Sequence, residues 1–176
     1  SETGILYVAN YLFHGLHRYS EAIDALLGAH GRGLLGLDGQ IQLCRYLQER
    51  KRAGESVPLL VPLVVLRPDD INLRVMIMAG WHHRGDAKSV REVFDAAEKH
   101  FHTPERWGEG VIVALAHACQ TSGLMDQGVG LWREAIGLHV RNASNRGIGD
   151  GTLSNYYQQL ADTLSRLGRT DEAVDA

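Results

Sequence analysis

The sequence predicts an all-α fold, an α-α superhelix (solenoid) of about five antiparallel helix–turn–helix repeats. Apolar residues recur at spacings of three and four along most of the chain, which is the period of a helix with one buried face. A short turn pattern returns along the 176 residues, and such repetition is typical of stacked helical units. Twenty glycines against four prolines supply many helix ends and few forced breaks.

The recurring turn begins with a helix-ending residue and closes with a small or apolar residue that opens the next helix. Glycine suits the first position because it adopts positive φ after a helix without steric cost. Short polar residues suit the later positions because they accept hydrogen bonds from the next helix's free N–H groups. Four copies start at His17, Gly85, Gly123 and Gly168, and a degenerate copy starts at Gly54. These starts are 37, 31, 38 and 45 residues apart. Known helical repeats have periods of about 34 or of about 40 and more, and against a period of 34 the excess is expected in the links between pairs.

The helical period supports the individual helices in order. Apolar stripes predict first helices near 5–16, 75–82, 111–119 and 157–164, and second helices near 90–97 and 131–138. In the first of these the stripe is Ile5, Val8, Leu12 and Leu16. The apolar run 59–66 is interpreted as a buried helix disturbed by Pro62, because Arg-Pro-Asp-Asp at 67–70 closes it. The polar, glycine-rich segment 142–151 predicts a loop.

Composition and motifs argue against several classes of protein. The net charge is −3, whereas nucleic-acid binders usually carry a basic excess. No apolar run reaches the length of a membrane span, and the start of the sequence has no basic segment typical of a signal peptide. The sequence also lacks the motifs of nucleotide-binding and hydrolytic enzymes. We therefore expect a cytoplasmic protein that is not an enzyme and carries no cofactor.

Cysteine and histidine give no metal pattern. Cys44 and Cys119 have no metal-binding or redox spacing, and we interpret them as small buried residues. The nine histidines form no HExxH-type motif. His100 and His102 close a predicted helix, where an imidazole interacts favourably with the helix dipole. The sequence therefore predicts no metal site.

Small and aromatic residues recur at matching positions of the predicted pairs. They are Tyr19, Ala22, Leu26 and Ala29 in the first pair, Trp81, Gly85, Phe94 and Ala97 in the third, Leu115, Ala116, Gly123, Trp132 and Ala135 in the fourth, and Leu160, Ala161, Gly168 and Ala173 in the fifth. With these residues the chain resembles the tetratricopeptide repeat family, in degenerate form. The second pair departs most, with Pro58 and Pro62 inside it. The resemblance implies a single repeat domain over 1–176, which we expect to be a fragment of a longer protein.

The resemblance also implies a concave groove lined by the first helices, where the family binds peptides. Projected onto this sequence, the groove is polar, and its cations outnumber its acids. Its predicted residues are Tyr7, Tyr11, His14, Gln48, Lys51, Arg52, Asn72, His82, His83, His117, Gln120, Asn155, Gln158, Asp162 and Arg166. Tyr7, Tyr11 and Trp107 are the candidate buried anchors. We expect a protein or peptide partner with acidic character or a C-terminal carboxylate.

Three functions follow from this sequence. The first is a protein–protein interaction scaffold without catalysis. The second is a recruiting or regulatory module of an enzyme that lies outside this segment. The third is RNA binding of the pentatricopeptide type, of which residues 114–136 show a faint pattern, although the acidic balance counts against it. A homodimer formed through the end repeats is a further expectation.

Overall fold

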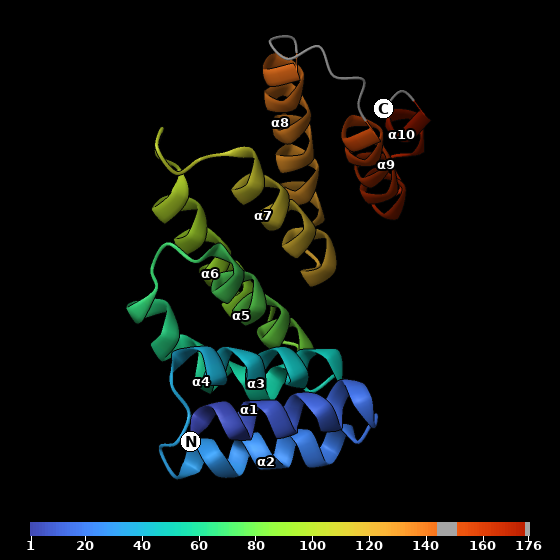
Figure 1. Ribbon diagram of the computed structural model, residues 1–176. Coiled ribbons are helices and arrows are strands. Elements are labelled where there is room, and N and C mark those ends of the chain that lie inside the picture. Colours follow the sequence, from blue (N-terminus) through green and yellow to red (C-terminus); the bar gives the residue numbers. More distant parts are fainter. Residues whose placement is uncertain (144–150, 175–176) are drawn as a thin grey trace. The chain divides into compact units, whose positions relative to one another are not determined.

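The computed structural model describes residues 1–143 and 151–174, and these residues form helices joined by turns, without a β-strand among them. Ten α-helices and one short π-helix follow one another along the described residues (Figure 1). They confirm the predicted all-α class. The chain divides into two compact units, residues 1–86 and 87–176. We describe each unit by itself, and a single domain over 1–176 stays a prediction.

Unit 1 packs its helices in chain order. It contains α1 (Glu2–Asn10), the π-helix η1 (Tyr11–Gly15), α2 (Tyr19–Gly31), α3 (Leu37–Glu49), α4 (Ala53–Leu66) and α5 (Ile71–His83). Each of these helices contacts the next one, as Figure 1 shows for the blue to green ribbons. The core at the start of the unit is built around Phe13, whose ring stacks on Tyr46 of α3 at a centroid distance of 3.7 Å. This stacking joins the first helix pair to the second.

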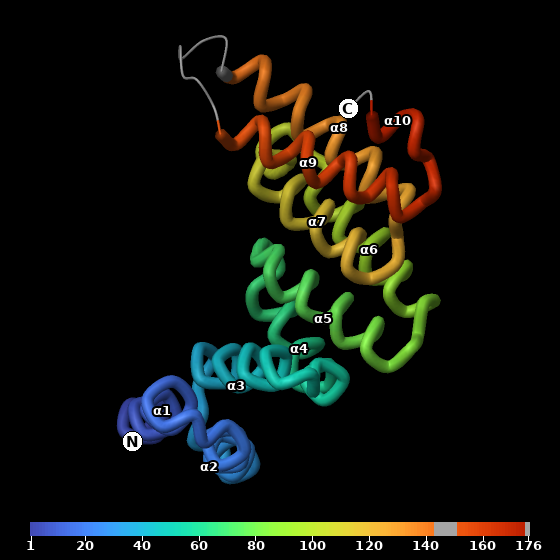
Figure 2. Tube along the Cα trace, turned by 90° about the vertical axis from the view of Figure 1, so that its right-hand side faces the viewer, coloured from blue at the N-terminus to red at the C-terminus, as the bar shows by residue number. Residues whose placement is uncertain are grey.

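Unit 2 contains α6 (Ala87–Phe101), α7 (Glu109–Ser122), α8 (Met125–Ala143), α9 (Gly151–Arg166) and α10 (Thr170–Val174). Consecutive helices again pack on one another, and Figure 2 shows α7, α8 and α9 in sequence. Trp132 of α8 is fully buried and contacts the rings of His117 on α7 and Tyr156 on α9. One aromatic side chain therefore links three successive helices of this unit.

The turn of the second pair starts at Lys51 and not at Gly54 as the sequence suggested. Lys51 has φ of 59°, whereas Gly54 lies inside α4. Glycine at 54 serves close packing instead, because a Cβ there would meet Cγ of Arg84 at 3.0 Å. The sequence pattern placed this turn three residues too late, because Gly54 serves helix packing and not the turn.

With this correction, the left-handed residues of the five turns are His17, Lys51, Gly85, Gly123 and Gly168. They are 34, 34, 38 and 45 residues apart, and about 34 is the period of a tetratricopeptide repeat. In the last four turns the next residue's N–H donates to the carbonyl five positions earlier, at 2.7–3.0 Å, which is a Schellman-type helix end. In the first turn Arg18 N–H donates to Leu12 O, six positions earlier, because the π-helix η1 adds one residue to the last helical turn.

Helix α4 runs continuously through Pro58 and Pro62. Proline has no N–H, so Pro58 leaves the carbonyl of Gly54 without its helical donor. That carbonyl accepts a hydrogen bond from Nε of Arg84 at 2.7 Å instead, so a side chain at the end of α5 repairs the helix. The sequence predicted that the run 59–66 is a buried helix. The run is helical but only half-buried, since Val65 is 78% exposed.

Two further expectations need correction. In the first helix the buried residues are Ala9 and Phe13, whereas Val8 and Leu16 are exposed, so the buried face lies one residue beyond the predicted stripe. The predicted loop 142–151 is shorter than expected, since α8 extends through Ala143 and α9 begins at Gly151. Residues 144–150 of that predicted loop lie outside the described residues.

Candidate functional site

An arginine–glutamate pair closes three of the five turns in the same way. Arginine follows the left-handed residue, and glutamate stands three positions after the arginine, in the first turn of the next helix. The pairs are Arg18–Glu21, Arg52–Glu55 and Arg169–Glu172, each joined by two hydrogen bonds. We call this arrangement the turn clasp. The paired hydrogen bonds fix the first turn of the second helix and hold the arginine guanidinium beside it.

Two of the turn clasps lower the pKa of their glutamates, those of Arg52–Glu55 and Arg169–Glu172. Hydrogen bonding from Arg52 lowers the pKa of Glu55 below its ordinary value. Glu172 accepts hydrogen bonds from both Arg169 and Arg133, which lower its pKa to about 2. These carboxylates are therefore ionised at neutral pH, and each is neutralised by an arginine beside it.

Three of the predicted groove residues lie together in unit 1. Lys51, Arg52 and His83 line a hollow of about 300 Å³, which Gly54, Glu55 and Arg84 complete. Here the α3–α4 turn lies next to the end of α5, and the Arg84 hydrogen bond to Gly54 holds the two together. We call this hollow the α4–α5 hollow. Its lining has three permanently charged cations and one carboxylate, which suits an anionic group.

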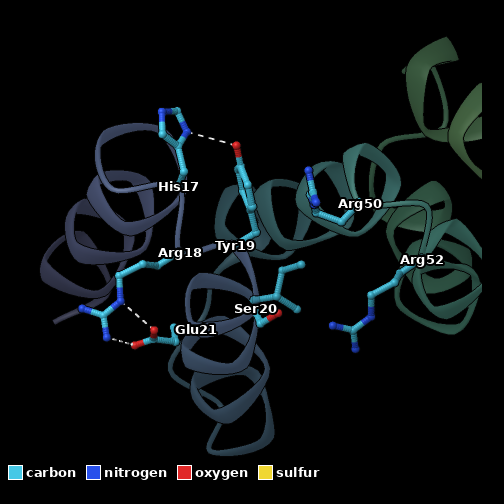
Figure 3. Close-up of a pocket in the computed structure, with 8 residues that line it drawn as sticks. His17, Arg18, Tyr19, Ser20, Glu21, Arg50 and Arg52 are labelled. Carbon is cyan, nitrogen blue, oxygen red and sulfur yellow. Dashed lines mark hydrogen bonds and ion pairs between the residues drawn. The ribbon is translucent and has the colours of Figure 1, made fainter.

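A second, larger hollow of about 420 Å³ lies between the first two turns (Figure 3). It is lined by His17, Arg18, Tyr19, Ser20, Glu21 and Ile23 from the first turn and α2, and by Arg50 and Arg52 from the end of α3 and its turn. We call it the α2–α3 hollow. Of these residues, only Arg52 belongs to the predicted groove. The signal that could have found the others is the repeated arginine after the left-handed residue.

The other predicted residues of unit 1 lie apart from these hollows. Tyr7 is 74% exposed and Tyr11 56% exposed. His14 is also exposed and touches the rings of Phe13 and Tyr46 at their edges. The amide of Gln48 donates to the backbone carbonyl of Met76 at 2.9 Å, so this side chain ties α3 to α5.

Asn72 and His82 are exposed at opposite ends of α5. Asn72 follows the capping residue Asp70, whose carboxylate accepts from Asn72 N–H at 3.0 Å. His82 stands in the last turn of α5 beside His83. The structure thus gathers Lys51, Arg52 and His83 into one site and leaves the other groove residues of unit 1 outside it.

In unit 2 the predicted residues form a chain of contacts between helices. Gln120 of α7 is only 5% exposed, and its amide donates to Asp162 of α9 at 2.8 Å. Asp162 also pairs with Arg166 at 3.1 Å. Gln120 therefore joins two helices and does not lie on an open face, contrary to the predicted groove.

The remaining residues predicted for unit 2 are surface side chains of α7 and α9. Asn155 and Gln158 are exposed. His117 packs its edge against Trp132, and burial lowers the pKa of His117. Trp107, a candidate anchor, stacks on His102 and donates through its indole N–H to Glu134 at 2.6 Å. A groove that continues along the whole chain stays a prediction.

The thiols of Cys44 and Cys119 are buried, and desolvation raises the pKa of each to about 12. Such thiols remain protonated and unreactive at neutral pH. Over residues 1–143 and 151–174 no three histidine, cysteine or acidic side chains are grouped so that they could hold a metal ion. The helices described are also too short or too polar to cross a membrane.

No protein-family model matches the chain. A mitochondrial pentatricopeptide repeat-containing protein of Arabidopsis thaliana is 27% identical over 106 residues, which are 60% of this chain and 14% of that protein. This chain thus spans about one seventh of that relative's length. A solved structure of kinesin light chain nearly identical TPR-like repeats from Podosopora anserina superimposes with a TM-score of 0.67 at 18% identity, covering 98% of this chain and 90% of that one. A second crystal structure, of a substituted variant of the same repeats, gives the same TM-score of 0.67 at 16% identity, covering 98% and 89%. The chain has the fold of tetratricopeptide-like helical repeats.

Proposed function

We propose that this protein is an interaction scaffold that binds an extended peptide segment of a partner protein and performs no catalysis. The observation that carries the proposal is the α4–α5 hollow, where Lys51, Arg52 and His83 converge from two helix pairs. Stacked helical repeats offer surfaces of this kind, since successive pairs place side chains in register along one edge. In unit 1 a peptide that follows the α4–α5 hollow meets side chains from two successive helix pairs.

The character of the exposed side chains supports binding through many modest contacts. Amides, imidazoles and guanidinium groups of the first helices can hydrogen-bond the backbone of an extended peptide. Tyr7 and Tyr11 offer two exposed rings on the first pair, and aromatic side chains often dominate the energy of an interface. Both buried thiols are protonated and unreactive at neutral pH, so neither is available as a nucleophile.

A peptide library displayed on phage and selected against the purified chain tests this function. We expect enriched sequences that bind the wild-type chain, and at least fivefold weaker binding to the double variant Lys51→Ala, Arg52→Ala. The matched control is Lys88→Ala, Arg91→Ala, which removes two cations from α6 outside both hollows. Circular dichroism checks that each variant keeps its helicity. Selection that enriches no peptide, or peptides that bind both double variants alike, would contradict the proposed site.

RNA binding is the second candidate, and the match to a pentatricopeptide repeat-containing protein favours it. Filter binding of a single-stranded RNA at 50 and 200 mM salt distinguishes the two functions. Contacts to several phosphates would make the affinity fall steeply with salt. A scaffold for peptides predicts weak RNA binding at both salt concentrations.

A further inference from the structure

The α2–α3 hollow contains an arginine that is held in place but forms no ion pair within the described residues. Arg50, the residue after the end of α3, lies with its guanidinium carbon 4.0 Å from the centre of the Tyr19 ring. The Tyr19 ring is itself fixed, because its hydroxyl hydrogen-bonds Nδ1 of His17 at 3.0 Å and its edge packs on Phe13. Figure 3 shows Arg50 beside Tyr19 at the side of the hollow opposite Arg18. Arg50 is therefore oriented before any ligand arrives.

The neighbouring charges leave Arg50 available. Glu21 is already engaged by Arg18, and Glu55 by Arg52. Asp24 interacts with Arg52 electrostatically and raises the pKa of Arg52, without a hydrogen bond between the two side chains. The hollow is lined by three arginines and by one carboxylate, Glu21. A guanidinium with its fork of N–H donors free recognises a carboxylate or phosphate by two parallel hydrogen bonds.

The two hollows of unit 1 share Arg52. We call the surface that connects the two hollows, with Arg50, Arg52, Lys51 and Arg84 along it, the turn edge of unit 1. A ligand that follows the turn edge meets Arg50 first, then Arg52, then Lys51 with Arg84. The left-handed residues of the first two turns, His17 and Lys51, border these hollows, one in each. The cationic groups repeat from one turn to the next, so the matching ligand carries repeated anionic groups.

We propose that the turn edge of unit 1 binds an acidic segment of a partner protein, with one anionic side chain on Arg50 in the α2–α3 hollow and another in the α4–α5 hollow. This inference rests on the proposed scaffold function and adds to it the chemistry of the partner and a second pocket.

An acidic peptide suits this edge better than RNA does. RNA-binding proteins rely on aromatic faces open to stack on bases. The tyrosine ring of the α2–α3 hollow is half-buried and has Arg50 over it.

Fluorescence anisotropy with a labelled hexaglutamate peptide tests the inference on the full chain. Six extended residues span about 20 Å. Hexaglutamine serves as the uncharged control, a hexapeptide of alternating phosphoserine and glycine tests phosphate as the source of charge, and a twelve-nucleotide oligouridine tests RNA. The decisive variant is Arg50→Ala. Its matched control is Arg45→Ala, which removes the same charge from an exposed position of α3 that lines neither hollow.

We expect hexaglutamate to bind and hexaglutamine not to bind. Arg50→Ala weakens hexaglutamate binding at least fivefold, Arg45→Ala changes it less than twofold, and Arg50→Lys lies between them because it keeps the charge but loses the fork. Tighter binding of the phosphoserine peptide with the same dependence on Arg50 supports the site and identifies phosphate as the preferred anion.

Equal weakening by Arg50→Ala and Arg45→Ala would overturn the site, since it would show only an effect of total charge. Oligouridine that binds more tightly than hexaglutamate and depends on Arg50 would overturn the peptide partner. Hexaglutamate that fails to bind, while selected neutral peptides still bind the wild-type chain, would overturn this inference and leave the scaffold function standing. Failure of both would end both proposals.

Discussion

The turns of the first two helix pairs and those of unit 2 all contain one left-handed residue, but different residue types occupy that position. His17 and Lys51 hold it in the first two, and Gly123 and Gly168 hold it in unit 2. A side chain in the left-handed region is disfavoured by about 1–2 kcal/mol. Glycine avoids this strain and offers no side chain. The comparison teaches that the turn requires the left-handed conformation and not a particular side chain, and that the two residues which carry a side chain there, His17 and Lys51, each line one of the two hollows.

The largest expected effect comes from removing a glycine where the fold needs it. Gly123→Ala places a Cβ at φ of 85° and should destabilise the chain by about 1–2 kcal/mol. The free energy of unfolding from urea titration measures this loss. No neighbouring atom lies within 4 Å of the added Cβ, so the loss reports backbone conformation and not a steric clash.

Gly130 provides the matched control in the next helix. It lies within α8, is exposed, and an added Cβ meets no atom within 4 Å. Gly130→Ala should stabilise the chain by about 0.5–1 kcal/mol, because alanine loses less conformational entropy in a helix. Changes of the same sign in both variants would show that the left-handed conformation does not set the stability of the turn.

The reverse substitution in the second turn should stabilise the chain. Lys51→Gly removes the strain at φ of 59° and, after the entropy that glycine loses on folding, should gain about 0.5–1 kcal/mol. The same urea titration measures it. The gain in stability should accompany weaker binding of acidic peptides, because Lys51 lines the α4–α5 hollow.

His17→Gly sharpens this test. Histidine enters the left-handed region more readily than lysine does, and His17 also accepts or donates a hydrogen bond with Tyr19. We therefore expect a smaller gain than for Lys51→Gly, or none. A larger gain at His17 would mean that the hydrogen bond to Tyr19 does not stabilise the first turn.

The sequence allowed the fold to be predicted because helix period and turn chemistry are local. Gly85, Gly123 and Gly168 marked their turns correctly, since glycine is the usual residue at positive φ. Lys51 could not be recognised, because lysine is not a residue that is typical of positive φ. The π-helix at residues 11–15 also has no sequence signal that periodicity detects.

The candidate site was predicted less completely than the fold. Lys51, Arg52 and His83 could be placed on one surface from their repeat positions, and they line one hollow. Arg50 was missed because its orientation depends on Tyr19, a residue 31 positions away whose ring position follows from the core. Gln120 was misplaced because its partner Asp162 lies on another helix. Contacts of this kind come from tertiary packing, which one sequence does not reveal.

A smaller effect should come from opening the turn clasp in unit 1. Glu55→Gln removes the carboxylate that Arg52 holds, and because this side chain is about half exposed the loss should be about 0.5 kcal/mol or less at pH 7. The lowered pKa of Glu55 means that its contribution is present above the ordinary value of 4.5 and is lost as the pH falls through the folded value. Urea titrations at pH 7 and pH 3 measure the difference between the two proteins, which should shrink at the lower pH. A difference that grows on acidification would contradict the clasp.

The smallest expected effect is a difference in pKa between Glu55 in unit 1 and Glu172 in unit 2. Glu55 is held by one arginine, whereas Glu172 accepts from Arg169 and Arg133. The side-chain carboxyl carbon of Glu172, followed by NMR, should therefore titrate at a pKa of about 2, below that of Glu55. Arg133→Ala should raise the Glu172 value toward that of Glu55, because each clasp then has one arginine, and should leave Glu55 unchanged. Equal titration of the two glutamates in the wild-type chain would show that the second arginine does not engage Glu172, and the clasps of the two units would then be equivalent.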